Sequence, residues 1–268
     1  MPQGYRLVNR RSEREVAVEG RGGAVEPHRE SRTERHGVLH VVEVDRRNPN
    51  RFDASSYGPA LADRGRVYPF FKRVFDLVGA SIAILALSPL FLGIVAICYA
   101  TGGSPIFRHR RVGRSGVLFD CLKFRTMVNN ADELLQDLLG SDRQITEEWL
   151  RDHKLKDDPR VTRFGRFLRQ TSLDELPQLW NVLCGDMSLV GPRPVVPDEL
   201  RRYGTRASTY LSALPGITGL WQVSGRNDTD YRRRVALDVC YIQSRSILVD
   251  IYILVKTLPA VFAKSGAY

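Results

Sequence analysis

One long run of apolar residues dominates the pattern of hydrophobic and polar positions along the chain. From Leu77 to Ala100, 24 consecutive residues carry no charge, and as a helix they would extend about 36 Å, enough to cross a bilayer core of about 30 Å. Pro89, preceded by Ser88, lies in the middle of this run, where proline removes a backbone hydrogen bond and clashes with the preceding turn. The pattern therefore predicts two helical halves, each reaching only the middle of a membrane.

Positive charge flanks the run on both sides. Lys72 and Arg73 precede it, and four arginines follow it at positions 108, 110, 111 and 114. Because Lys and Arg favour the cytoplasmic side, both ends are expected there. The preferred interpretation is a re-entrant helix over 74–101, broken at Ser88–Pro89, with the Ser88 hydroxyl bonding part of the backbone that Pro89 leaves unpaired. A kinked spanning helix and a buried core helix are the alternatives.

Shorter segments predict the remaining elements. Residues 117–124 indicate a strand, and apolar spacing predicts helices over 131–139, 163–169, 173–183, 231–242 and 247–262. Arg163, Arg166 and Arg169 recur every third residue between apolar positions, which predicts an amphipathic helix with a basic stripe. The segment 247–262 is apolar nearly all round, as in a helix at a membrane interface or packed on a core. The fold class is therefore helix-rich, α/β to α+β, with amphipathic interfacial helices and a small sheet element.

The first 66 residues lack such a pattern. They contain 13 Arg, no Lys and 10 acidic residues, mixed with Gly, Ser and Pro, which predicts a disordered Arg-rich tail. The first thirty residues contain no apolar stretch of the kind found in a secretory signal. The domain division is therefore 1–66 for the tail and 67–268 for the folded part.

Composition adds a preference for anionic partners. The 268 residues carry a net charge of +10, which favours phosphates, anionic lipid or nucleic acid without choosing among them. The 34 Arg and 6 Lys suit phosphate recognition and equally reflect a GC-rich genome. Four widely spaced cysteines form no metal or disulfide motif, and a reducing compartment fits best; they lie at positions 98, 121, 184 and 240.

The segment from Arg169 to Asn181 is the most informative for chemistry. Ser172 and Glu175 have the spacing of a capping box, although Pro177 complicates that register, and either way Asp174 falls at a helix N-terminus. There the free amides and the helix dipole favour a carboxylate and equally suit a phosphate. An ordinary helix start explains the same pair, so the pattern leaves both interpretations open.

Two glycine-rich loops follow. After Gly185, which permits a left-handed helix exit, two prolines enclose Arg193 in the sequence Gly-Pro-Arg-Pro. The second loop begins at Leu214 and ends near Arg226. A rigidly held arginine is well suited to phosphate binding.

Together these segments resemble the bacterial sugar transferase family, the monotopic polyprenyl-phosphate phosphoglycosyl transferases that begin exopolysaccharide and O-antigen assembly. The similarity covers about residues 67–268, with the motifs in family order: Lys72–Asp76, Ser88–Pro89, Lys123–Met127, Asp158–Arg160, Ser172–Gly191, Gly191–Pro194, Pro215–Gly219, Gly225–Asn227 and Leu237–Val239. Within the family the chain is most similar to hexose-1-phosphate transferases, many of which use UDP-galactose or UDP-glucose.

This resemblance implies transfer of a sugar-1-phosphate from a UDP-sugar to undecaprenyl phosphate, with release of UMP. Asp174 would be the nucleophile that carries a covalent phospho-sugar, and Glu175 a ligand of Mg²⁺ or Mn²⁺. A carboxylate is already ionised at neutral pH, so no general base is needed. Four family-matched residues are expected to neutralise the phosphates: Lys123, Arg169, Arg193 and Arg226. Arg125 and Asp238 are further family-matched polar positions to which the resemblance assigns no role.

The resemblance also implies a location. Undecaprenyl phosphate keeps its phosphate at the membrane interface, so the enzyme is expected on the cytoplasmic face of the bacterial inner membrane, in contact with lipid. Exopolysaccharide assembly proteins are possible partners of the tail, and no nucleic-acid partner is expected.

Two other functions compete. Asp228 and Asp230 form a D-x-D motif, as in nucleotide-sugar glycosyltransferases, but no alternating strand–helix pattern precedes it. A basic membrane scaffold or nucleic-acid binder would explain the charge, yet the sequence contains no recognisable nucleic-acid module.

Overall fold

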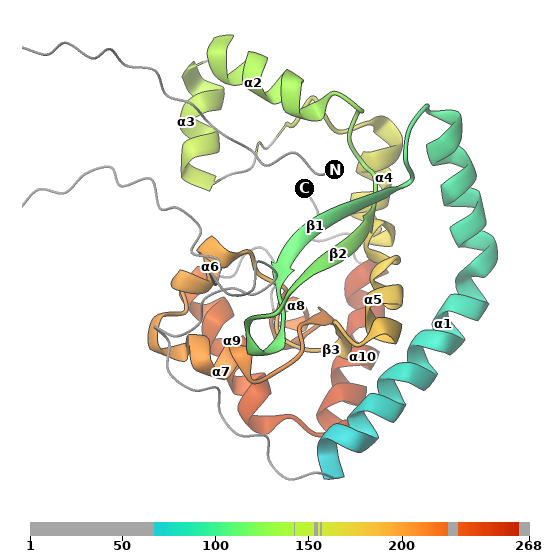
Figure 1. Cartoon of the computed structure of the whole chain (residues 1–268), viewed down its shortest axis with the longest axis vertical. Helices are drawn as coiled ribbons and strands as arrows, with labels where there is room; N and C mark the ends of the chain where they lie inside the picture. The colour runs from blue at the N-terminus through green and yellow to red at the C-terminus, as the bar shows by residue number, and fades with distance from the viewer. Residues whose placement is uncertain (1–66, 142, 153–154, 156, 225–229, 263–268) are drawn as a thin grey trace, which may run out of the picture. The chain divides into compact units, whose positions relative to one another are not determined.

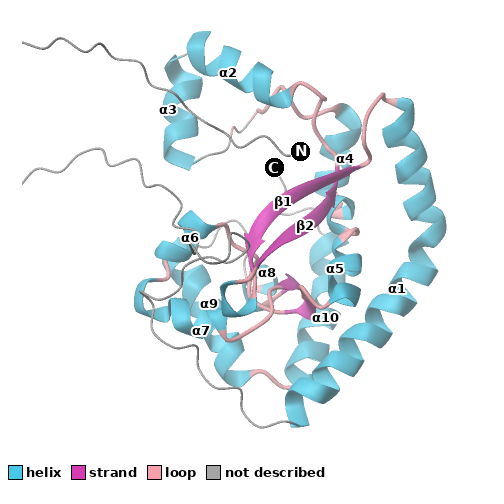
Figure 2. Cartoon of the chain, viewed as in Figure 1, coloured by secondary structure: helices cyan, strands magenta, loops and turns pink. Residues whose placement is uncertain are grey.

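The computed structural model describes residues 67–141, 143–152, 155, 157–224 and 230–262. The predicted tail, 1–66, lies outside the described residues, as do Arg226 and Asp228. Within the described part, helices predominate, and the strands form two sheets of two strands each (Figure 2). The expectation of a helix-rich fold with a small sheet element is confirmed.

Helix α1 (Val67–Ala100) runs without interruption for 34 residues, and Figure 1 shows it as one curved helix. The predicted break at Ser88–Pro89 is therefore wrong. Pro89 leaves the Leu85 carbonyl without its usual helical donor, and Ser88 Oγ donates to that oxygen at 2.8 Å, which is the compensation expected from the sequence. Only 11% of the most apolar stretch of α1 is buried, so the alternative of a buried core helix does not fit.

The N-terminal part of α1 is fastened by polar contacts. Arg73 donates to the carbonyl oxygens of Val182 and Leu183, at 2.6 and 2.9 Å. These carbonyls lie in the last turn of helix α5 (Gln178–Cys184), where a cation is favourable. The Asp76 carboxylate accepts a hydrogen bond from the Leu189 backbone at 3.1 Å. The basic and acidic residues ahead of the apolar run therefore dock the helix.

The C-terminal part of α1 packs against the same body. Ile94 and Cys98 are buried in a cluster with Phe124 and Leu168. Arg125 Nη2 donates to the Cys98 carbonyl at 3.2 Å. Arg125 thus caps the end of α1, where carbonyl groups lack intrahelical donors.

A β-hairpin follows α1. Strand β1 (Ile106–Val112) pairs antiparallel with β2 (Leu118–Phe124) through a 3-10 turn at Arg114–Gly116. The predicted strand at 117–124 is confirmed, whereas β1 was not predicted because its arginines obscure the alternation. Directly opposed residues share a face of such a pair, so the register places the side chains at 107, 109 and 111 on the same face as those at 119, 121 and 123.

Three helices come next: α2 (Ala131–Ser141), α3 (Arg143–Asp152) and α4 (Arg163–Gln170). Thr162 is the N-cap of helix α4, and its Oγ1 accepts from the Gly165 amide at 2.8 Å. The basic stripe is only partly on the surface, because Arg163 and Arg166 are exposed while Arg169 turns inward.

The segment predicted as one helix over 173–183 is divided. Leu173–Glu175 forms a single 3-10 turn, and α5 starts only at Gln178. Helix α5 ends at Gly185, whose φ of 90° is the predicted left-handed exit. Strand β3 (Ser188–Val190) then pairs in parallel with β4 (Gly216–Thr218).

The two glycine-rich loops form one backbone unit. The Gly191 amide donates to Thr218 O at 2.9 Å, and the Gly216 amide to Pro192 O at 2.8 Å. A Cβ atom at Gly191 would lie 2.6 Å from the Gly216 nitrogen, so only glycine permits this approach. The loop that carries Arg193 is therefore held by β4, the short strand within the second loop.

The remaining helices complete the body: α6 (Pro197–Arg201), α7 (Ala207–Leu211), α8 (Leu220–Val223), α9 (Tyr231–Ser244) and α10 (Ile247–Phe262), with a 3-10 turn at Gly204–Arg206. The predicted helices at 231–242 and 247–262 are confirmed. Helix α10 buries Asp250 and Ile253 but leaves Leu248 79% and Val255 61% exposed. One face thus packs on the core, and another remains apolar and uncovered.

Candidate active site

Asp174 and Glu175 lie in the 3-10 turn between α4 and α5. Ser172, just before the turn, adopts a left-handed conformation with φ of 56°, which is unusual for a residue other than glycine. The expected capping box is wrong, because the Ser172 side chain makes no cap hydrogen bond and the Glu175 carboxylate bonds a lysine on β2. The turn therefore presents both carboxylates toward the hairpin.

Lys123 on β2 joins the two carboxylates. Its Nζ lies 2.6 Å from Glu175 Oε1 and 3.7 Å from Asp174 Oδ2. The Asp174 side chain is 12% exposed, and those of Lys123 and Glu175 are 29% and 31% exposed. The site is thus shielded around Asp174 and open on the side of Glu175.

The pKa values of the two carboxylates are shifted in opposite directions. Burial raises the pKa of Asp174, and Glu175 adds to the rise, whereas Lys123 and Arg169 oppose it, so that the pKa is about 6. Burial also disfavours charge on Glu175, but the charge and hydrogen bond of Lys123 outweigh it and hold that pKa below its ordinary value. At neutral pH both groups are predominantly ionised, with Asp174 the more basic of the two.

Arg169 supports Asp174 from α4. Its Nε donates to Thr126 Oγ1 at 2.9 Å. Burial lowers the pKa of the guanidinium, while the charges of Asp174 and Asp158 raise it. Asp158 in turn receives two hydrogen bonds from the Arg160 guanidinium, at 2.8 and 2.7 Å. The family-matched Asp-Pro-Arg segment therefore closes on itself as a buried ion pair.

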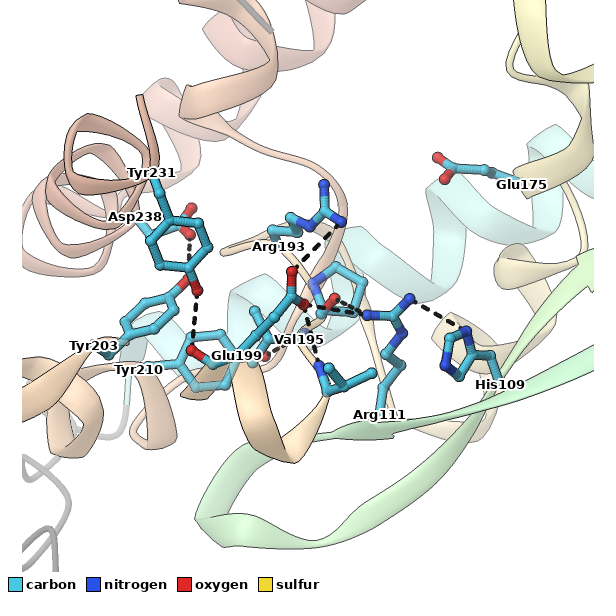
Figure 3. A network of polar contacts seen from close by, with 12 residues as sticks. His109, Arg111, Glu175, Arg193, Val195, Glu199, Tyr203, Tyr210, Tyr231 and Asp238 are labelled. Atoms are coloured by element: carbon cyan, nitrogen blue, oxygen red, sulfur yellow. Dashed lines mark hydrogen bonds and ion pairs between the residues drawn. The ribbon is translucent and has the colours of Figure 1, made fainter. Parts of the chain in front are cut away.

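Arg193 belongs to a second charged group, which also contains Arg111 and Glu199 (Figure 3). Glu199 Oε2 lies 3.4 Å from Arg111 Nη1, and Glu199 Oε1 lies 4.0 Å from Arg193 Nη2. Both arginines lower the pKa of Glu175, so the charge of this second group acts on the Asp174–Glu175 pair.

His109 lies beside Arg111 on the same face of β1. Its Nδ1 is 3.3 Å from Arg111 Nη2, and because a guanidinium can only donate, Nδ1 is the acceptor and the ring proton resides on Nε2. Burial lowers the pKa of His109 to about 4, with Arg111 and Lys123 acting in the same direction. His109 is therefore neutral at physiological pH.

Asp238 is enclosed behind the second group rather than beside Asp174. It is fully buried, and its Oδ2 accepts from the Tyr203 hydroxyl at 2.7 Å. Oδ1 has no well-formed hydrogen bond among the described residues, although the Arg193 backbone is close enough to favour the charged form. Burial dominates and raises the pKa of Asp238 to about 7.

The predicted residues thus divide into groups. The structure brings Lys123, Arg169, Asp174 and Glu175 together, and Arg193 is close enough for its charge to lower the pKa of Glu175, while Arg226 lies outside the described residues. Arg125 caps the C-terminal end of α1, and Ser88 and Pro89 lie within that helix. Asp230, half of the D-x-D motif, caps α9 by accepting from the Arg232 amide at 2.9 Å.

Sequence reasoning missed His109, Arg111 and Glu199. The register of the hairpin could have revealed the first two, because they share a face with Lys123 once β1 is recognised. No sequence signal marks Glu199, since its role depends on where α6 lies.

A divalent cation fits the donors that are present. Among the described residues no three metal-ligating side chains come together, so a cage made only of protein groups is not formed there. Mg²⁺ commonly uses one or two carboxylates together with substrate phosphates. Glu175 would supply such a ligand through Oε2, because Lys123 bonds its Oε1 and Oε2 has no partner in the described part of the chain.

Comparison with known proteins now decides the family. The bacterial sugar transferase profile matches residues 67–264. The chain belongs to this family. Among known bacterial sugar transferases, it is 53% identical over 199 residues to the undecaprenyl-phosphate galactose phosphotransferase of Salmonella typhimurium. The matched region covers 74% of this chain and 42% of that protein.

Two other relatives are shorter. The chain is 52% identical over 198 residues to the exopolysaccharide production protein ExoY of Sinorhizobium fredii, covering 74% of this chain and 88% of that one. It is 40% identical over 206 residues to the UDP-glucose:undecaprenyl-phosphate glucose-1-phosphate transferase of Caulobacter vibrioides, covering 74% and 72%. The chain therefore spans less than half of the Salmonella relative and most of the other two.

Proposed function

We propose that the protein transfers a hexose-1-phosphate from a UDP-sugar to undecaprenyl phosphate and releases UMP, at the start of exopolysaccharide synthesis. The names of the relatives support the substrates, with galactose or glucose as the sugar. The observation that carries the chemistry is the shielded Asp174 carboxylate held against Glu175 by Lys123.

The proposed reaction has two displacements at one phosphorus atom. In the first, an Asp174 carboxylate oxygen attacks the β-phosphorus of the UDP-sugar, the bond to the α-phosphate oxygen breaks, and UMP leaves with that electron pair. In the second, an oxygen of undecaprenyl phosphate attacks the same phosphorus and displaces the Asp174 carboxylate. Both nucleophiles are already anionic, so neither step requires a general base.

Charge repulsion is the main barrier to this chemistry, because nucleophile and substrate are both anionic. The described cations around the pair include Lys123, Arg169, Arg193 and Arg111, and fixed cations in a shielded site stabilise charge more strongly than water does. When bound through Glu175 and the substrate phosphates, Mg²⁺ or Mn²⁺ would supply further neutralisation. Lys123 would then reduce the repulsion between the Asp174 and Glu175 carboxylates, since its ammonium lies close to both.

We further propose that the enzyme lies on the cytoplasmic face of the inner membrane with α1 inserted from that side. Both ends of α1 contact the same body, at Arg73 and Asp76 and again at Cys98. Its middle exposes Leu85 by 75% and Leu92 by 71%, which suits contact with lipid. A phosphate at the membrane surface would then be within reach of a site on the body.

The experiment that tests this function traps the covalent intermediate. Purified protein in micelles is incubated with Mg²⁺ and a UDP-hexose labelled in the sugar, without the lipid acceptor. A labelled adduct on the Asp174 peptide and release of UMP are expected, and Asp174→Asn should give neither. Asp198→Asn, which changes an exposed carboxylate on α6, is the matched control.

Release of UDP in place of UMP would instead indicate a glycosyltransferase, and adduct formation by Asp174→Asn would contradict the nucleophile. A panel of UDP-sugars in the full reaction identifies the sugar.

A further inference from the structure

Two arginines reach the site from distant parts of the chain. Arg111 lies on β1, and Arg193 lies in the loop after β3. Between them stands Glu199, in the first turn of α6, with its two oxygens divided: Oε2 faces Arg111 at 3.4 Å and Oε1 faces Arg193 at 4.0 Å. Figure 3 shows this carboxylate between the two guanidinium groups.

Glu199 is itself held in place. The Val196 amide donates to Glu199 Oε2 at 3.3 Å, which fixes the side chain at the start of α6. Arg111 Nη1 also donates to the Pro194 carbonyl at 3.3 Å. Arg193 packs over the Trp221 ring, at 5.4 Å from the ring centroid. Arg111 also donates to His109 Nδ1 at 3.3 Å, and the Glu199 carboxylate is the group that the two arginines share.

The Glu199 carboxylate reduces the repulsion between the two arginines. Burial lowers the pKa of Arg111 and Arg193 lowers it further, whereas Glu199 raises it. Two guanidinium groups this close repel one another in a partly buried site, and a carboxylate between them removes most of that repulsion. The three side chains are only 15%, 22% and 24% exposed, for Arg111, Arg193 and Glu199.

Arg111 shares a face of the hairpin with Lys123, and Lys123 contacts both Asp174 and Glu175. Both Arg111 and Arg193 hold down the pKa of Glu175, so their charge is felt at the Asp174–Glu175 turn. A diphosphate carries two adjacent anionic groups, which complement two adjacent cations, whereas a monophosphate carries one phosphoryl group.

We propose that Glu199 is a positioning residue that holds Arg111 and Arg193 side by side as a binding pair for the diphosphate of the UDP-sugar. In this assignment Arg111 is an additional substrate-binding residue, and Glu199 does not touch substrate. The proposal rests on the proposed function, because it takes the nucleotide sugar as the ligand.

The first test is Glu199→Gln. The amide oxygen of glutamine can still accept from Val196, but the negative charge is lost, so the arginines should separate. The KM for the UDP-sugar is expected to rise about tenfold, with the KM for undecaprenyl phosphate changing less than about twofold. Asp198→Asn removes the same charge one residue earlier, on an exposed position, and should leave both KM values unchanged.

The second test is a double-mutant cycle with Arg111→Gln. Arg111→Gln alone should also raise the donor KM about tenfold, and adding Glu199→Gln should then change it less than about twofold, because a lone arginine needs no counter-ion. A donor KM that rises about a hundredfold in the double variant would overturn the proposal. So would an unchanged donor KM in Glu199→Gln, or an equal rise of both KM values in that variant.

If Glu199→Gln does not fold, the comparison of Arg111→Gln with the double variant carries the test. Equal donor KM values support the proposal, and a tenfold difference overturns it. Failure of this proposal can be told apart from failure of the proposed function, because the latter is tested by adduct formation on Asp174 in the wild-type protein.

Discussion

Lys123 shows how much a single side chain contributes at the residue scale. It lies close to two carboxylates that would otherwise repel one another, whereas the family resemblance implied only a phosphate-binding role. In the structure its nearest contacts are Glu175 and Asp174. The lysine therefore contacts the proposed nucleophile, Asp174, and its ammonium is already paired with protein carboxylates before a substrate phosphate binds.

Replacing this lysine tests that role. Lys123→Met should lower the rate of sugar-phosphate transfer by about 10²–10³-fold, since it removes the cation nearest to the developing charge. Lys123→Arg, which keeps the charge, should recover a measurable part of the loss. Turnover of UDP-hexose in micelles provides the measurement, and a Lys123→Met enzyme with near wild-type turnover would contradict it.

Asp238 provides a second test at the residue scale, through stability. Its pKa is about 7 in the folded protein and about 3.9 in an unfolded chain. The folded state therefore binds more protons between these values, and stability falls as pH rises from about 4 to 7 and then levels off. Asp238→Asn cannot ionise but can still accept from Tyr203.

Relative to wild type, the Asp238→Asn variant should gain about 2–3 kcal/mol of stability between pH 5 and pH 8. Thermal unfolding in micelles at both pH values measures the difference. A constant offset between the two proteins at pH 5 and pH 8 would show that Asp238 does not titrate in this range.

At the element scale, α1 is distinguished by its attachment. Lys72 Nζ lies 2.9 Å from Asp76 Oδ1 and 3.1 Å from Asp250 Oδ2, which links α1 to α10. Tyr241 donates to Asp250 Oδ1 at 2.7 Å. The three charged side chains are 12%, 2% and 0% exposed, so this is a buried ion-pair network.

Breaking this network should be costly. Lys72→Met leaves two buried carboxylates without their cation and should destabilise the protein by about 3–5 kcal/mol. Arg143→Met breaks an exposed pair on α3, with side chains 92% and 65% exposed, and should cost less than about 1 kcal/mol. Thermal unfolding compares the two variants, and equal midpoints would contradict the role of the network.

The attachment of both ends of α1 also makes a prediction about topology. Cysteines placed at Ala62 and Ser104, on either side of the helix, should both be protected from an impermeant maleimide in intact spheroplasts and both react after permeabilisation. The exposed native thiols, Cys184 and Cys240, are first replaced by serine. Reaction of one flank alone in intact spheroplasts would show that α1 spans the membrane.

At the scale of the whole molecule, the candidate site is assembled from distant segments. Lys123 comes from the hairpin, Arg169 from α4, Asp174 and Glu175 from the turn before α5, and Arg193 from the interlocked glycine loops. The sequence predicted most of these residues because the family motifs contain them. It could not say which contact which, because residues 52 positions apart, such as Lys123 and Glu175, are brought together only by packing.

Local patterns predicted the elements unevenly for physical reasons. The apolar run, the strand at 117–124 and the helices at 231–242 and 247–262 follow from periodicity, which acts within one segment. The capping box failed because Lys123 offered Glu175 a stronger, charged partner than the backbone amide. The break at Pro89 failed because one hydroxyl satisfied the freed carbonyl.

The sequence by itself determined the family, the long apolar helix and the identity of the acidic pair, because these depend on residue type and local spacing. Only the tertiary structure decided the environment of those residues. It placed a lysine between the carboxylates, raised the pKa of Asp174 through burial, enclosed Asp238, and set Glu199 between two arginines. Charge–charge energies depend on distance and burial, and both are properties of the folded chain.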